Sequence, residues 1–166
     1  MAGPSRETRF LADRMLGRLA RYLRFLGYDV SYPPPSTDTA LIAAARAEGR
    51  VLLTRDRGIL ERASGGKPVV VEIASSSVLE QVAQLYSEGW LGGRFPPRCC
   101  ECNSRLEEIS SEEARHLVPP FVLAVQVRFA LCAVCNAVLW EGSHWESFHA
   151  AISRGSGGLT PPEEGA

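Results

Sequence analysis

The stretch "RVLLTRDRGIL" (residues 50–60) decides how this chain is expected to fold. Residues 51–53 form an apolar run of the kind that occupies a buried strand. Asp56 follows this run closely and lies between Arg55 and Arg57. A buried strand that leads to a carboxylate between two guanidinium groups predicts a polar site at the end of that strand.

Strands and helices alternate on both sides of this stretch. Apolar runs predict strands at residues 8–12, 28–32, 51–54 and 67–73, and amphipathic segments predict helices at 15–26, 39–48, 58–63 and 76–89. Gly27 and Gly49 stand where helix C-caps belong. This alternation predicts parallel βαβ units, with a sheet covered by helices on both faces. The fold class is therefore expected to be α/β.

Three aspartates are expected at one edge of this sheet. Asp13 follows the first strand, Asp56 follows the third, and Asp38 stands before the helix after the second strand, as its expected N-cap. Open α/β sheets bind ligands at the carboxyl ends of their strands, and clustered carboxylates suit Mg²⁺ or Mn²⁺. The pattern predicts a divalent metal that activates water. The alternative is that each aspartate only caps a helix or pairs with a neighbouring arginine.

A stripe of arginines begins beside Asp13. Arg14, Arg18 and Arg21 lie at spacings of four and three along the first helix, which contains no acid, and Arg24 lies just beside them. A basic track that leads to an acidic edge suits a phosphate backbone approaching a metal site. The alternatives are a solvated helix face and a codon bias toward arginine, because 17 of the 18 basic residues are Arg.

The character of the chain changes after residue 94. Residues 1–94 carry 13 basic and 10 acidic side chains, whereas residues 95–166 carry 5 basic and 9 acidic ones, within a net charge of −1. We expect a first domain at 1–94, a second module at 95–150 and a polar tail at 151–166 with no reason to fold. The elements expected in the second part are a strand at 121–131, one or two helical turns at 113–117 and a short helix at 145–153.

Cysteines occur only in this second part. Cys99 and Cys102 form one C-x-x-C pair, Cys132 and Cys135 form another, and each pair is followed by Asn. Two such turns complete a tetrahedral Zn²⁺ site, and the 29-residue gap between them fits a ribbon with an insertion. Disulfides and a redox pair are the alternatives. The cytoplasmic character of the chain disfavours disulfides, and a thioredoxin-like redox motif would place one C-x-x-C at a helix start, not two far apart. Cys100 is the spare thiol, although it could replace Cys99.

The motifs together resemble one known family. "FLADRMLGRLARYLRFLGYDV", Asp38 before a helix, "RVLLTRDRGIL", "RCCECN", "CAVCN" and "LWEGSHWESF" look like the Mut-seven C-terminal RNase family, which has PIN-like domains followed by a zinc ribbon. The resemblance runs from about Phe10 to about Phe148. It implies a PIN-like three-layer α/β/α domain with a parallel sheet, a small zinc-ribbon module and a metal-dependent ribonuclease activity.

The resemblance also implies site residues. It maps the acidic site onto Asp13, Asp38 and Asp56, and it maps zinc onto Cys99, Cys102, Cys132 and Cys135. "GSHW" (142–145) matches a family motif, so His144 is a candidate for contact with RNA, with a histidine bonded to the ribbon backbone as the alternative. PIN nucleases often carry a fourth acid shortly after the third, where this chain has Arg57, Gly58 and Ile59.

The predicted function is hydrolysis of RNA phosphodiester bonds by an endonuclease that uses Mg²⁺ or Mn²⁺ and holds a structural zinc. Arg14, Arg18, Arg21, Arg55 and Arg57 are expected to contact RNA phosphates. One alternative is a non-catalytic RNA-binding adaptor, with the ribosome as a candidate partner, which the missing fourth acid favours. Another is a nuclease acting on DNA. No apolar leader or membrane span is visible, so a cytoplasmic location is expected, and the oligomeric state is not predicted.

Overall fold

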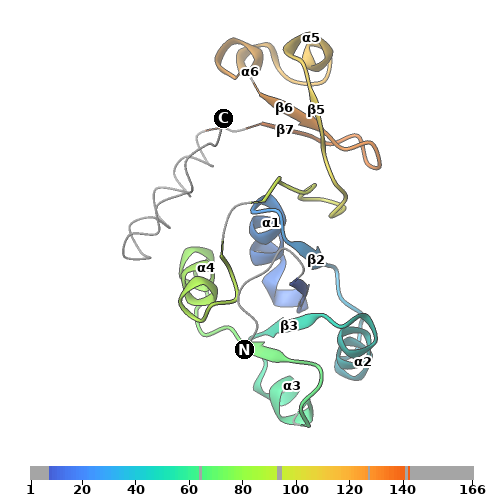
Figure 1. Cartoon of the computed structure of the whole chain (residues 1–166), viewed down its shortest axis with the longest axis vertical. Helices are drawn as coiled ribbons and strands as arrows, with labels where there is room; N and C mark the ends of the chain where they lie inside the picture. Colours follow the sequence, from blue (N-terminus) through green and yellow to red (C-terminus); the bar gives the residue numbers. More distant parts are fainter. Residues whose placement is uncertain (1–7, 64, 93–94, 127, 141, 143–166) are drawn as a thin grey trace.

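Two sheets organise the chain. The computed structural model describes residues 8–63, 65–92, 95–126, 128–140 and 142. A parallel sheet of four strands and an antiparallel sheet of three strands lie toward opposite ends of the long axis of the molecule (Figure 1). Among the described residues, no helix is long and apolar enough to cross a membrane.

The first sheet is parallel throughout and has the order β2-β1-β3-β4. Its elements in chain order are β1 (Arg9–Ala12), η1 (Arg14–Leu16), α1 (Gly17–Phe25), β2 (Asp29–Ser31), α2 (Asp38–Glu48), β3 (Val51–Thr54), α3 (Arg57–Arg62), β4 (Val70–Glu72) and α4 (Val78–Ser87). The chain leaves β1 for β2 on one side and returns to β3 on the other. The carboxyl ends of β1 and β3 therefore form a topological switch point, the place where open α/β sheets bind ligands.

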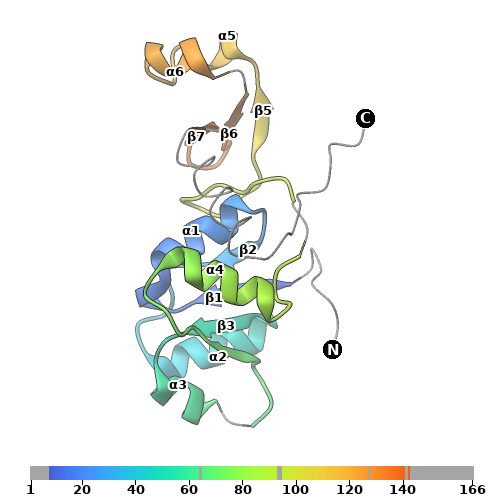
Figure 2. The ribbon, with the colours of Figure 1, turned by 90° about the vertical axis from the view of Figure 1, so that its left-hand side faces the viewer.

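Side chains of the central strands alternate between two cores. Phe10, Ala12 and Leu53 pack with residues of α1 and α4, whereas Leu11 and Leu52 pack with residues of α2 and α3. Figure 2 shows α1 and α4 on one side of β1 and β3, and α2 and α3 on the other. The strands are apolar on both faces because both faces are covered. The expected three-layer α/β/α arrangement is confirmed.

Helix boundaries follow local signals with two corrections. Gly27 and Gly49 have positive φ angles of 91° and 62°, as expected of the residues that end α1 and α2. The expected N-cap Asp38 is instead the first residue of α2, because the Thr37 hydroxyl accepts a hydrogen bond from the backbone N–H of Ala40 (3.3 Å). The helix expected from residue 15 starts as a 3₁₀ turn, and its α-helical part begins at Gly17.

The second sheet is antiparallel and carries two short helices. Its elements are β5 (Glu107–Ile109), α5 (Ser111–Ala114), α6 (Pro120–Val125), β6 (Phe129–Leu131) and β7 (Val138–Trp140), with the strand order β5-β6-β7. Val118, Val122 and Phe129 form much of its small core, together with Ala114. We call this part, with the four paired cysteines, the cysteine module, and the part around β1–β4 the parallel-sheet module.

The strand expected over residues 121–131 is wrong for its first half. Pro120 lies in the first turn of α6, where its missing N–H is not needed, and the helix continues through Val125. Among the described residues of this range, only 129–131 form a strand. The helical turn expected at 113–117 begins two residues earlier, because Ser110 and Glu113 form a capping box. The helix expected at 145–153 and the tail at 151–166 lie outside the described residues.

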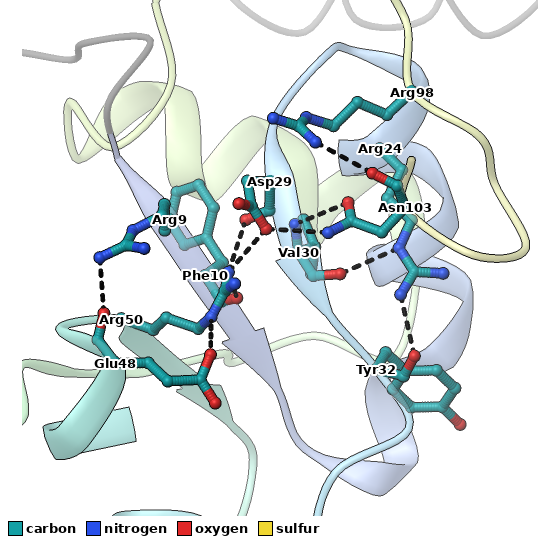
Figure 3. Close-up of polar contacts among 10 residues, drawn as sticks. All are labelled: Arg9, Phe10, Arg24, Asp29, Val30, Tyr32, Glu48, Arg50, Arg98 and Asn103. Atoms are coloured by element: carbon teal, nitrogen blue, oxygen red, sulfur yellow. Dashed lines mark hydrogen bonds and ion pairs between the residues drawn. The ribbon is translucent and has the colours of Figure 1, made fainter. Parts of the chain in front are cut away.

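Polar side chains join the two modules beside β2 (Figure 3). Asp29 accepts hydrogen bonds from Arg50 (2.7 Å) and from the side-chain amide of Asn103 (2.8 Å). Burial acts to raise the pKa of Asp29, but these two hydrogen bonds and the charges of Arg50 and Arg98 together outweigh it and hold the pKa below its ordinary value. A carboxylate with a lowered pKa stabilises the fold at neutral pH, and this contribution is lost as the pH falls through the lowered pKa.

We predict that Gly27→Ala destabilises the fold. A Cβ at this position would lie 2.5 Å from the Cβ of Phe95 and 2.7 Å from the carbonyl oxygen of Pro96, and the φ angle of 91° is unfavourable for alanine. The free energy of unfolding, measured by urea denaturation, should fall by more than about 1 kcal/mol. Gly65→Ala is the control, because a Cβ there would meet no atom within 4 Å outside its chain neighbours. Equal stability of the two variants would contradict this account of Gly27.

Candidate active site and metal centre

Asp13 is fixed between the two central strands. It follows β1, its backbone N–H donates to the carbonyl of Leu53 (2.9 Å), and the residue is only 8% exposed. Its Oδ1 accepts a hydrogen bond from the backbone N–H of Arg14 (2.6 Å), and its Oδ2 accepts one from the hydroxyl of Thr54 (2.7 Å). Both oxygens of this carboxylate are therefore oriented by neighbouring backbone and side-chain groups.

The hydroxyl of Thr54 connects Asp13 with Asp56. Thr54 is the last residue of β3 and is fully buried. Its Oγ1 donates to Asp13 and accepts a hydrogen bond from the backbone N–H of Asp56 (3.0 Å). The Oδ1 of Asp56 in turn accepts from the backbone N–H of Gly58 (2.7 Å) and caps α3. Thr54 was not expected as a site residue, because in the sequence it only ends an apolar strand.

Asp38 reaches the same edge of the sheet from α2. Its carboxylate forms an ion pair with Arg62 of α3. A Cβ at Gly58 would lie 3.0 Å from Nη2 of Arg62 and 3.1 Å from Oδ1 of Asp56, so the guanidinium group that binds Asp38 passes close to Asp56. Among the described residues, the three aspartates do not form a cluster placed to hold a metal ion together. Their sharing of one metal ion stays a prediction.

Glu72 adds a fourth carboxylate that the sequence interpretation missed. It is the last residue of β4 and pairs in register with Thr54. Its Oε1 lies 3.2 Å from Nε of Arg57, so Arg57 contacts Glu72. The fourth strand was expected to end at residue 73. Had it been expected to end at residue 72, the rule that the carboxyl ends of parallel strands share one edge would have placed Glu72 with the aspartates.

The expected arginine stripe is divided by the fold. Arg14, Arg18 and Arg21 are not buried, nor are Arg55 and Arg57 beside the acidic edge. The guanidinium group of Arg14 also contacts the carbonyl of Ser36 (3.4 Å), which ties the loop before α2 to the end of β1. Arg21 forms an ion pair with Glu101 of the cysteine module. Arg24 is buried and does not belong to the exposed stripe. His144 lies outside the described residues.

Four thiols come together in the cysteine module. The sulfur atoms of Cys99, Cys102, Cys132 and Cys135 all lie within 4.8 Å of one another. The Sγ atoms of Cys99 and Cys135 are 3.4 Å apart, as are those of Cys102 and Cys132, whereas a disulfide requires about 2.05 Å. Four thiolates around a tetrahedral zinc ion have neighbouring sulfur atoms roughly 3.8 Å apart, for Zn–S bonds of about 2.3 Å. The cluster therefore fits such an ion.

The two cysteine turns have the same backbone geometry. In each, the Asn after the second cysteine donates its backbone N–H to the carbonyl of the first cysteine, at 2.9 Å for Asn103 and 2.8 Å for Asn136. These asparagines have φ angles of 68° and 60°, in the left-handed region that Asn tolerates better than most residues. The "CN" pair seen twice in the sequence is thus a conformational requirement of the turn.

Cys100 does not belong to the four-thiol cluster. Burial raises the pKa of its thiol to about 11. Within the cluster, contacts with the side chain and backbone of Ser104 lower the pKa of Cys102 to about 6, whereas contacts with the other cysteine thiols raise the pKa of Cys135 to about 12. The cluster contains Cys99 and not Cys100, and the role of Cys100 as a spare thiol stays a prediction.

Comparison with known protein families shows that one family model matches the whole described region of the chain. The family model described as Mut7-C RNAse domain matches residues 8–152, which include both sheets and the four clustered cysteines. This match confirms the resemblance drawn from the sequence motifs. Neither the curated proteins nor the solved structures contain a significant match to the chain.

Proposed function

Because the chain belongs to the Mut7-C RNAse domain family, we propose that it is a metal-dependent endoribonuclease whose reaction takes place at the carboxyl ends of β1 and β3. Family membership implies a nuclease with an RNA substrate. One observation carries the finer proposal. Asp13 and Asp56 lie after neighbouring strands, at the switch point of the sheet, and one buried hydroxyl, that of Thr54, contacts both residues.

The acidic residues present are suited to Mg²⁺ or Mn²⁺. Asp13 and Asp56 would hold the ion, with Asp38 as a third carboxylate and Glu72 as a fourth. Each carboxylate oxygen has two lone pairs, so an oxygen of Asp13 that accepts one hydrogen bond can still ligate a cation. When bound, such an ion lowers the pKa of a coordinated water and stabilises the charge that develops on the phosphate.

The residues around these acids limit their mutual repulsion. Arg62 pairs with Asp38 and lies close to Asp56, and Arg57 pairs with Glu72. Thr54 and the backbone of Arg14 orient the two oxygens of Asp13 before any substrate arrives. Preorganised groups need little rearrangement during the reaction, which is the main way in which a protein favours phosphoryl transfer.

Exposed arginines would hold the RNA backbone. Arg14 and Arg18 follow directly from the acidic edge along η1 and α1, and Arg55 and Arg57 flank Asp56. Arg21 would contribute less than the first two, because Glu101 already pairs with it. A guanidinium fork matches a phosphate in a bidentate manner and carries no base specificity. A contact from His144 to RNA stays a prediction.

The four clustered cysteines would hold a structural zinc ion. Four thiolates fill a tetrahedral coordination shell and leave no position for water, so this centre would not be catalytic. Its role would be to fold the cysteine module, whose apolar core is small.

The second candidate function is a non-catalytic RNA-binding adaptor. The ion pair between Asp38 and Arg62 favours it, because it gives this aspartate a structural role. The Gly58 hydrogen bond that makes Asp56 a helix cap favours it too. An adaptor would keep the arginines and the zinc ion but would bind RNA without cleaving it, and assays of the variants below separate the two functions.

We predict that Asp13→Asn and Asp56→Asn each lower RNA cleavage by about 100-fold or more, because a metal ligand worth several kcal/mol of transition-state stabilisation is lost. The measurement uses labelled RNA and labelled DNA of one sequence, with Mg²⁺, with Mn²⁺ and with chelator. Glu107→Gln, on exposed β5, is the control and should retain full activity. Full activity of Asp56→Asn would refute the acidic site.

A matched pair at Thr54 sharpens this test. Thr54→Val keeps the shape of the side chain but removes the hydroxyl that contacts Asp13 and Asp56, so cleavage should fall by about tenfold or more. Thr54→Ser keeps the hydroxyl and should retain most of the activity. The same loss in both variants would mean that packing, and not the hydrogen bonds, explains the effect.

We predict that changing Arg14 and Arg18 together to Gln weakens RNA binding equally for different sequences. The slope of log affinity against log salt concentration should decrease by about two, because each lost phosphate contact removes roughly one unit. Arg115→Gln, on the cysteine module next to Glu112, is the control. An unchanged slope in the double variant would identify these arginines as a solvated face.

We predict that the two metals can be removed separately. Gel filtration into metal-free buffer should abolish cleavage and leave zinc bound, because structural zinc is held far more tightly than Mg²⁺, and added Mg²⁺ or Mn²⁺ should restore cleavage. Elemental analysis should give close to one zinc ion per chain in the natural protein and in Cys100→Ser, but little in Cys102→Ser. A zinc-free chain with Cys99 and Cys102 joined in a disulfide would contradict the zinc site.

A further inference from the structure

Arg24 is a buried cation with no part in the proposed RNA contact. It lies in the last turn of α1 and is 3% exposed, whereas Arg21, one turn earlier, is exposed. A buried guanidinium group is costly unless its donors are satisfied and its charge is compensated. The position of Arg24 between the two modules therefore requires an explanation.

The donors of Arg24 are satisfied by carbonyl oxygens from both modules. Its Nε donates to Val30 (3.0 Å) and its Nη2 to Tyr32 (2.9 Å), in and just after the edge strand β2 (Figure 3). Its Nη1 donates to the carbonyls of Cys100 (2.9 Å) and Glu101 (3.0 Å). These last two residues lie between the clustered cysteines Cys99 and Cys102, so one side chain joins β2 to the first cysteine turn.

The charge of Arg24 is compensated by the cysteine turn. Among the described residues, no ion pair joins Arg24 to a carboxylate. Burial lowers the pKa of its guanidinium group, and the ionised thiols of Cys102 and Cys99 and the carboxylate of Glu101 act in the opposite direction. A zinc ion with four thiolate ligands has a net charge of about −2. A buried cation beside this centre would be stabilised by it and would stabilise it in return.

A second contact holds the same turn on the same strand. Asn103 follows Cys102 directly, and its side-chain oxygen accepts a hydrogen bond from the backbone N–H of Val30 (3.1 Å). The backbone N–H of Arg98, just before Cys99, donates to the carbonyl of Arg24 (2.8 Å). The first cysteine turn thus covers polar groups that the edge strand β2 would otherwise expose.

We propose that Arg24 is a positioning residue of the zinc site, which compensates the negative charge of the four-thiolate centre and couples zinc binding to the edge strand of the parallel-sheet module. This inference rests on the zinc site proposed above and does not depend on the ribonuclease activity. By linkage, zinc stabilises the edge of β2 as much as the docked β2 edge strengthens zinc binding.

The test measures zinc affinity in the full chain by competition with a chromophoric chelator. Arg24→Gln should lower the affinity at least about tenfold, as is usual when a group that supports metal ligands is removed. Arg24→Lys, which keeps the charge but not the planar fork, should lose less. Arg21→Gln is the matched control, because Arg21 pairs with Glu101 of the same turn but lies on the surface, and its effect should stay within about twofold.

A measurement on the natural protein covers the case in which Arg24→Gln does not fold. Amide exchange followed by mass spectrometry should show faster exchange in the segment around Val30 after zinc removal, with little change in β3. Unchanged exchange at Val30, or equal zinc affinity of Arg24→Gln and Arg21→Gln, would overturn this inference but not the proposed zinc site. A natural protein that holds no zinc would overturn both this inference and the proposed zinc site.

Discussion

The parallel pairing of β1 with β3 is the constraint on which the rest of the molecule depends. Leu11 lies beside Leu52 and Ala12 beside Leu53, so the two strands bury matching side chains on both faces of the sheet. A shift of one residue would exchange the faces and place each apolar set in the wrong core. The same register brings Asp13 to Thr54, and thereby defines the polar edge at the switch point.

A second set of contacts joins the cysteine module to the parallel-sheet module at β2. The first cysteine turn lies against β2, the outer strand of the parallel sheet, and is held there by Arg24 and Asn103. The arrangement explains two features that look unrelated in the sequence. Arg24, near the exposed arginines of α1, is buried and contacts the cysteine turn. Asn103, which permits the left-handed turn, also covers the edge of β2.

Much of the fold and part of the candidate site could be predicted from the sequence. The strands were visible because buried parallel strands are continuous apolar runs, and the cysteine cluster was visible because its ligands come in local pairs. Thr54, Glu72 and the task of Arg24 were missed because each depends on a partner that lies elsewhere in the chain. The spacing of Arg24 along α1 gave no sign that residues 100–101 would cover it. The apolar composition of residues 121–125 predicts a strand, but Pro120 begins the helix α6 there.

The carboxyl ends of β1 and β3 are the proposed place where a catalytic divalent ion binds. The most direct measurement is anomalous X-ray diffraction from crystals soaked in MnCl₂ at a concentration that supports RNA cleavage. We expect an anomalous peak within bonding distance of carboxylate oxygens of Asp13 and Asp56. A peak bound only by other residues, with none at this edge, would contradict the proposed site.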